Sequence, residues 1–163
     1  MAKSIARDNL GSTIMTGAVA GAAGGLAEIA WVSLYAAVTG GNAAVIAKGV
    51  TTAAGVDALF PNAAASAGVG IHMILSLALG IVLTVAVRQL TSGRHVRAVS
   101  LAALAAVWGV NFFVILPLVS PAFTHLLPYA VSLTSKLLFG LAAGQVLVLQ
   151  ARRLPFATVL GRR

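Results

Sequence analysis

The chain has 163 residues, of which 60% are apolar and only 9% are charged, and its mean hydropathy is +1.00. Soluble globular domains carry about 25% charged residues, so this composition excludes a soluble domain and predicts a protein embedded in lipid. Because the chain has no cysteine, disulfides, thiolate nucleophiles and cysteine-based zinc or iron–sulfur sites are excluded. The net charge of +8 does not indicate a nucleic-acid partner, because the basic residues lie at the ends of apolar runs.

Four apolar runs are long enough to cross the hydrocarbon core of a bilayer, which takes about 20 residues. They cover residues 13–38, 67–87, 98–118 and 126–149. Lipid offers the backbone no hydrogen-bond partner, so spans of this length are predicted to be helices. The predicted fold is all-α: an integral membrane four-helix bundle that forms a single transmembrane domain over residues 1–163. The first run is too long for the apolar part of a signal peptide and three more follow it, so we interpret it as a retained span.

A glycine ladder runs through the first span, with Gly17, Gly21 and Gly25 four residues apart. Glycines at this spacing are typical of a helix face that packs closely on another helix. Glu28 follows Gly25 by about one turn, so it is predicted to face protein rather than lipid. The same ladder would serve oligomerisation.

The connection after the first span predicts a short helix over residues 43–60 that lies at the membrane surface. Asn42 is placed to cap its start, and apolar residues recur at helical spacing opposite Lys48 until Pro61 ends the pattern. A re-entrant segment is the alternative.

The second and fourth spans each carry one stripe of small and polar residues at a spacing of four. The stripes are His72, Ser76, Gly80 and Thr84 in the second span and Ser132, Lys136, Gly140 and Gly144 in the fourth. Residues four apart share one face of a helix, so Gly140 and Gly144 are predicted to mark a packing face as well. Asn111 supplies the polar group of the third span.

The basic residues predict the orientation in the membrane, because cytoplasmic connections are enriched in lysine and arginine. Nine of the eleven fall on one side if both termini are cytoplasmic: Lys3, Arg7, Arg88, Arg94, Arg97, Arg152, Arg153, Arg162 and Arg163. The connection after the third span holds none.

Two residues with a formal charge at pH 7 stand inside apolar runs, Glu28 in the first and Lys136 in the fourth. A charge at bilayer depth costs about 3 kcal/mol on insertion scales and normally faces a partner or a wet cavity. At a helical rise of about 1.5 Å per residue both residues lie at a similar depth in the outer half, with His72 and Asn111 slightly nearer the outside. A polar cluster of Glu28, His72, Asn111 and Lys136 is therefore predicted, either as a structural ion pair or as a site for protons, ions or a ligand.

No cofactor is predicted, and haem and a divalent metal are the two alternatives. Haem between helices usually needs two histidines at matching depth, and His125 lies near the outer surface while His72 is deeper. A divalent metal such as Zn, Mn or Fe would take Glu28, His72 and His125 as oxygen and nitrogen ligands. The paired Glu-x-x-His motifs of di-iron bundles do not occur.

An enzyme is not expected, because the sequence has no GxSxG, HExxH or phosphate loop. The preferred function is a non-catalytic accessory or scaffold protein that packs in a homo-oligomer or a larger membrane complex. The alternative is a small oligomeric transporter or channel that moves protons or a metal ion through Glu28, His72 and Lys136.

The first 90 or so residues carry a pattern that resembles a known group of proteins. A glycine-laddered span and a short helix ending in proline precede Gly68, His72, Ser76 and Gly80 at a spacing of four. This order is similar to that of small four-span bacterial inner-membrane proteins of no assigned activity. The resemblance implies a bacterial inner-membrane location and assigns no functional residues.

Overall fold

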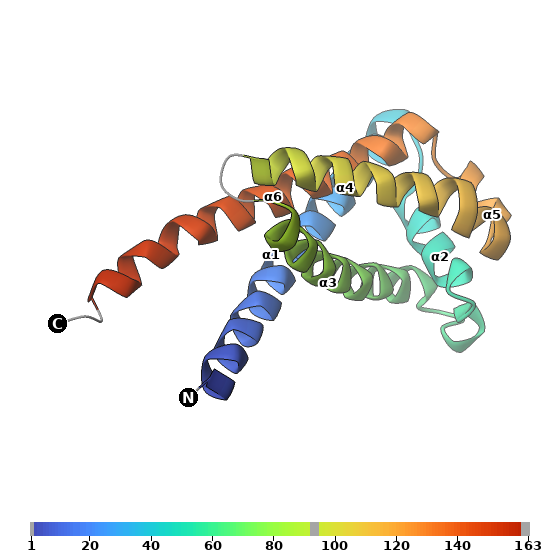
Figure 1. Ribbon diagram of the computed structural model, residues 1–163. Helices are drawn as coiled ribbons and strands as arrows, with labels where there is room; N and C mark the ends of the chain where they lie inside the picture. The colour runs from blue at the N-terminus through green and yellow to red at the C-terminus, as the bar shows by residue number, and fades with distance from the viewer. Residues whose placement is uncertain (1, 92–94, 161–163) are drawn as a thin grey trace.

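The computed structural model of the chain describes residues 2–91 and 95–160, and these two ranges contain helices and turns but no strand. The long helices are α1 (Ala2–Thr39), α3 (Ala64–Leu90), α4 (Val96–Val110) and α6 (Tyr129–Leu160) (Figure 1). The short elements are α2 (Ala43–Ala53), the 3-10 turns η1 (Asp57–Leu59) and η4 (Pro121–His125), the π-helical turn η3 (Asn111–Ile115) and α5 (Leu116–Val119).

Four helical segments are long and apolar enough to cross a membrane, which confirms the number and order of the predicted spans. They are Leu10–Thr39, Ala64–Leu90, Val96–Val119 and Tyr129–Ala151. The fourth begins three residues later than the sequence indicated, directly after Pro128, because a residue before proline is disfavoured in the helical region. The third is one continuous rod in which α4, η3 and α5 follow one another.

The short helix between the first two spans begins where it was predicted to begin but ends earlier. The Asn42 side chain accepts a hydrogen bond from the backbone N–H of Ala44 at 2.9 Å, which caps α2. The helix ends at Ala53 rather than near residue 60, because Gly55 adopts a φ of +69° that an α-helix cannot contain. The chain then turns through η1 towards α3.

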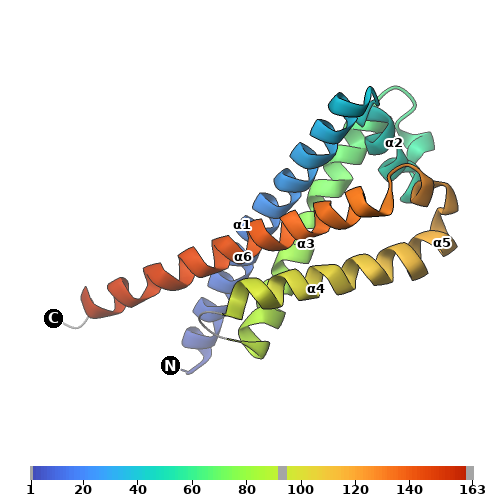
Figure 2. The ribbon, with the colours of Figure 1, turned by 90° about the horizontal axis from the view of Figure 1, so that it is seen from above.

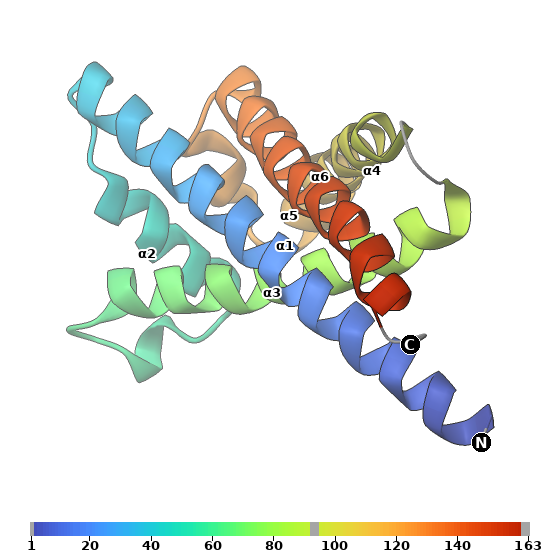
Figure 3. The same cartoon turned by 90° about the vertical axis from the view of Figure 1, so that its left-hand side faces the viewer.

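The four long segments do not close into the expected four-helix bundle. Their extensive contacts run in the order α3–α1–α6–α4, while α3 and α4 contact each other little. Figure 3 shows α1 and α6 side by side, with α3 crossing α1. In Figure 2, α3 and α4 diverge from one end of the molecule. The arrangement is therefore open on the side between α3 and α4.

The two ends of the molecule differ in what they bring together. One end holds the start of α1, the end of α3, the start of α4 and the end of α6, and we call it the terminal end (Figure 2). The opposite end, with α2 and η4, we call the loop end. This alternation is what four consecutive antiparallel crossings require.

The glycine ladder packs α1 directly on α3. A methyl group at Gly17 would lie 2.5 Å from Cα of Ile81, and one at Gly21 would overlap the backbone of Ser76. Gly80 meets the same ladder from the α3 side, against Gly17 and Gly21. The ladder is thus occupied within one chain, so it is not the free oligomerisation face that the sequence suggested.

Gly140 and Gly144 have the corresponding role between α6 and α4. A methyl group at Gly140 would lie 3.1 Å from the Ser100 carbonyl oxygen, and one at Gly144 would lie 3.2 Å from the Ser100 side chain. The Ser100 hydroxyl donates to the Val96 carbonyl oxygen on its own helix at 2.8 Å, so it needs no partner across the interface.

An apolar core fills the half of the molecule nearer the terminal end. Phe139 lies at its centre with no exposed surface and rests against Gly24 of α1. The buried members of this core come from α1, α3, α4 and α6 and are Ala20, Leu83, Val87, Val96, Leu104, Phe139, Ala143 and Leu147. All four long segments therefore meet tightly here, in contrast to the loop end.

Candidate functional site

Glu28 of α1 and Lys136 of α6 form a direct ion pair. The Lys136 Nζ lies 2.8 Å from Oε1 and 2.9 Å from Oε2 of Glu28. Glu28 is only 3% exposed, whereas the Lys136 side chain keeps 20% of its surface exposed. The carboxylate is thus enclosed by protein, and its charge is balanced by an ammonium group that still reaches open space.

Ser135 is a second partner of the carboxylate. Its Oγ lies 3.2 Å from Oε1 of Glu28 and 2.8 Å from the carbonyl oxygen of Ser132 one turn earlier. A hydroxyl has a single proton, which these two acceptors share. With Lys136 and Ser135 together, both oxygens of Glu28 have donors, as a buried carboxylate requires.

His72 joins the pair from α3. Its Nε2 lies 3.7 Å from Oε2 of Glu28, 3.4 Å from the Gly25 carbonyl oxygen and 3.4 Å from Oγ of Ser76. The carboxylate and the carbonyl can only accept hydrogen bonds, so we assign the proton of the neutral ring to Nε2. Nδ1 is then an acceptor, and no residue that the structure describes pairs with it.

The close approach of α1 and α3 is what lets His72 reach this position. A methyl group at Gly25 would lie 2.7 Å from the Ser76 hydroxyl oxygen and 3.2 Å from the Met73 sulfur. Any side chain at Gly25 would therefore push α3 away and remove His72 from Glu28. The last glycine of the ladder is part of the site as well as of the packing.

Asn111 supplies a polar group from the opposite side. It is half-buried, and its side-chain amide has no hydrogen bond to any part of the chain that the structure describes. It begins the π-helical turn η3, where the Leu116 N–H bonds to the Asn111 carbonyl oxygen five residues back. Pro117 explains the wider turn, because a proline has no N–H and its ring clashes with the carbonyl four residues earlier. Such turns often occur at functional sites.

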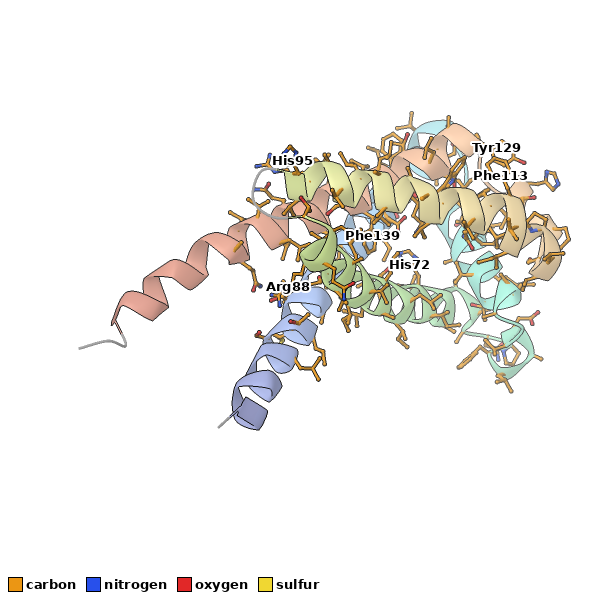
Figure 4. All side chains as sticks on the ribbon, viewed as in Figure 1. His72, Arg88, His95, Phe113, Tyr129 and Phe139 are labelled. Carbon is orange, nitrogen blue, oxygen red and sulfur yellow. The ribbon has the colours of Figure 1, made fainter. Side chains whose placement is uncertain are left out.

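These groups line a cavity of about 630 Å³ between α1, α2, α3, the α4–α5 rod and the start of α6. Glu28, His72, Asn111 and Lys136 all contribute to its wall, and Figure 4 shows His72 between α3 and α4. Most of the remaining wall is apolar: Ile29, Val32, Ile46, Val50, Val69, Ile71, Leu75, Leu79, Phe112, Ile115, Leu116, Val119, Phe123 and Leu127. The cavity thus has one polar spot on an otherwise apolar surface.

Helix α2 closes the loop end of this cavity. It packs on α3 through Gly68, where any side chain would overlap the Ala47 carbonyl. Thr51 is fully buried and donates to the Ala64 carbonyl oxygen at 2.5 Å, which joins the two helices. The apolar face of α2 therefore faces the cavity, where the sequence suggested contact with the membrane surface.

Two tryptophans hold the first turns of α6 in position. The indole N–H of Trp31 on α1 donates to the Val131 carbonyl oxygen at 3.0 Å, and that of Trp108 on α4 donates to Oγ of Ser132, also at 3.0 Å. Both bonds anchor the turn of α6 that precedes Lys136. They set the rotation of α6 and so the direction in which the ammonium group points.

The metal set considered from the sequence does not come together. His125 ends η4 and does not line the cavity that Glu28 and His72 share. Within residues 10–91 and 95–151, no three histidine, aspartate or glutamate side chains form a group that could hold a metal ion. Haem would need a second histidine opposite His72, and the cavity wall contains none.

Sequence reasoning did not identify three features of the site: Ser135, the cavity wall formed by α2, and the π-helical turn. Ser135 had a signal, because it directly precedes Lys136 and lies three residues after Ser132. Pro117, late in the third span, was the signal for an altered turn. The wall formed by α2 depends on how distant helices meet and has no local signal.

Comparison with protein-family models, curated proteins and solved structures finds no match for this chain. Fold and site together therefore define a class and no more: an all-helical chain with four segments able to cross a membrane and a largely apolar cavity around a buried ion pair.

Proposed function

We propose that the chain is a multi-pass protein of the bacterial inner membrane with both termini on the cytoplasmic side. The four apolar segments support membrane insertion. The orientation is supported by the sequence, in which basic residues gather near both termini and around the connection between the second and third apolar segments. The resemblance of the first 90 or so residues to small four-span bacterial inner-membrane proteins implies the same location.

We infer that the protein acts by binding a small lipophilic molecule, as a non-catalytic accessory protein of the membrane. The observation that carries this inference is the cavity with the Glu28–Lys136 pair in its wall. Ligand sites are typically concave, about 300–1,000 Å³ in volume and mostly apolar, with a few polar groups that orient the ligand. The cavity matches this description in volume and lining.

Conduction of protons or metal ions is less well supported by the geometry. A conducting path would have to continue from the cavity to the terminal end. The cavity wall reaches no further than Leu79 on α3 and Lys136 on α6. Beyond that level the apolar core around Phe139 and Leu104 fills the space between the helices.

Two isoleucines on α3 offer a matched test. Ile71 lines the cavity, whereas Ile74 is 67% exposed and does not. We expect Ile71→Trp to weaken binding of a dodecyl-chain probe to the protein in phosphatidylcholine nanodiscs by about tenfold, since it fills part of the cavity, and Ile74→Trp to leave binding unchanged. Equal binding by both variants, or no binding to the wild type above that of empty nanodiscs, would overturn the proposal. Native mass spectrometry of the released protein measures the bound fraction.

A further inference from the structure

The charges in the cavity wall cancel, and this restricts what the cavity can hold. Among the described residues that line it, Glu28 and Lys136 are the only two with a formal charge when His72 is neutral. They pair at 2.8 Å and so leave the cavity without net charge. Resting on the function proposed above, we propose that the ligand is an uncharged amphiphile: an apolar chain with one hydrogen-bonding head group that carries no formal charge.

The donors and acceptors around the pair that have no protein partner indicate which head group would fit. An ammonium group has three donors, and the two hydrogen-bonding partners of Lys136 Nζ are both oxygens of Glu28. One N–H therefore remains for a ligand. Nδ1 of His72 offers an acceptor, and the Asn111 amide offers both kinds of group across the cavity. A hydroxyl or a primary amide, which donates and accepts at once, complements this set.

A ligand with an anionic head would have to take Lys136 from Glu28. Glu28 is nearly fully enclosed, so it would remain as a buried charge without a counter-ion, which is strongly unfavourable. A ligand with a cationic head has no better site, because both oxygens of Glu28 already have donors in Lys136 and Ser135. Either charged head would also give up its hydration inside a largely apolar wall.

The open side of the helix arrangement suits a lipophilic chain. Because α3 and α4 make few contacts with each other and diverge towards the loop end, a molecule dissolved in the bilayer can reach the cavity from the side. Its chain would lie along the apolar residues of α3 and η3, such as Leu75 and Ile115, with the head group at Lys136. No passage through water is needed.

Three probes with the same chain and different heads test the proposal: dodecanol, dodecanesulfonate and dodecyltrimethylammonium, the last two of permanent charge. We expect wild-type protein in phosphatidylcholine nanodiscs to bind dodecanol at least about tenfold more tightly, at equal mole fraction in the bilayer, than either charged probe. Preference for a charged probe, or equal binding of all three, overturns the inference while leaving the binding function intact. Binding of none of them overturns the function itself.

Two variants link the preference to the ion pair. In Glu28→Gln the unpaired Lys136 gives the cavity a positive charge, so the preference should shift towards dodecanesulfonate. In the double variant Glu28→Gln with Lys136→Met the cavity is neutral again, so the shift towards dodecanesulfonate should disappear. Dodecanol itself should bind more weakly than to the wild type, because the Lys136 N–H is lost. A folded Glu28→Gln protein that keeps the wild-type ranking shows that the pair does not set selectivity and overturns that assignment. If the single variant fails to fold, the relative affinities of the wild-type protein for the three probes still test the proposal.

Discussion

The carbonyl oxygen of Gly25 on α1 lies 3.4 Å from Nε2 of His72 on α3, so the residue that ends the glycine ladder directly contacts the polar cluster. The same residue therefore takes part in the packing of α1 on α3 and in the polar cluster. The ladder brings α3 close enough for His72 to reach Glu28, and the same closeness leaves no room for a side chain at Gly25. Substitutions that separate α1 from α3 should therefore also change the distance between His72 and Glu28.

A methyl group at Gly80 should destabilise the fold by separating α1 from α3. It would overlap the backbone of Gly17 and Gly21, and overpacking of this kind costs about 1–3 kcal/mol. Gly70, on the same helix, has no atom within 4 Å of the position that its methyl group would take. We therefore expect Gly80→Ala to lower the unfolding temperature in detergent and Gly70→Ala to leave it unchanged or raise it slightly. Equal effects of the two substitutions would contradict the packing shown here.

Removal of the negative charge alone should lower the free energy of unfolding more than removal of both charges of the ion pair. Glu28→Gln keeps the shape of the side chain but leaves the Lys136 ammonium without its counter-ion. Breaking a buried pair in this way costs about 3–5 kcal/mol, whereas replacing both partners by uncharged groups is often nearly neutral. Because Lys136 keeps 20% of its surface exposed, a loss nearer the lower value, about 3 kcal/mol, is expected.

The comparison of unfolding temperatures tests this directly. The double variant Glu28→Gln with Lys136→Met should recover most of the stability that the single variant loses. If single and double variants unfold at the same temperature, the pairing of charges is not what stabilises this part of the fold. Ile74→Met, at an exposed position of α3, serves as a control for a conservative change.

The local features of this fold could be predicted from the sequence. Apolar length is enough to locate the four spans, and a glycine every fourth residue is enough to place Gly17, Gly21 and Gly25 on one face with Glu28 close to it. The Asn42 cap is equally local, since a side chain contacts the backbone two residues on. Each of these depends only on the geometry of a single helix.

The features that the sequence did not reveal depend on how helices cross. Regular polar stripes on each span suggested a closed bundle with a shared interior. In the structure α1 and α6 lie between α3 and α4, because the glycine faces of α1 and of α6 are each filled by one neighbour, at Gly80 and at Ser100. The cavity is the space that this order leaves open. Spacing within one helix does not contain that information.

The orientation can be tested with introduced cysteines, because the chain has none of its own. Ala122, on η4, and Gln89, near the end of α3, are both exposed and lie at opposite ends of the molecule. With the terminal end in the cytoplasm, a membrane-impermeant maleimide should label Ala122→Cys in intact cells lacking an outer-membrane barrier. Gln89→Cys should react only after the cells are permeabilised. The reverse pattern would show that the protein is inserted the other way round.

A protein that binds rather than conducts should not move ions across a bilayer. The core around Phe139 separates the cavity from the terminal end, and water or an ion in that apolar layer would lack partners. In liposomes of the purified wild-type protein, proton flux and zinc or manganese flux should therefore equal those of empty liposomes. The contrary result is well defined: wild-type flux above the empty-liposome level that Glu28→Gln abolishes while the protein stays folded. That outcome would establish transport through the cluster and would require the core to open, because Glu28 lies on the cavity side of Phe139.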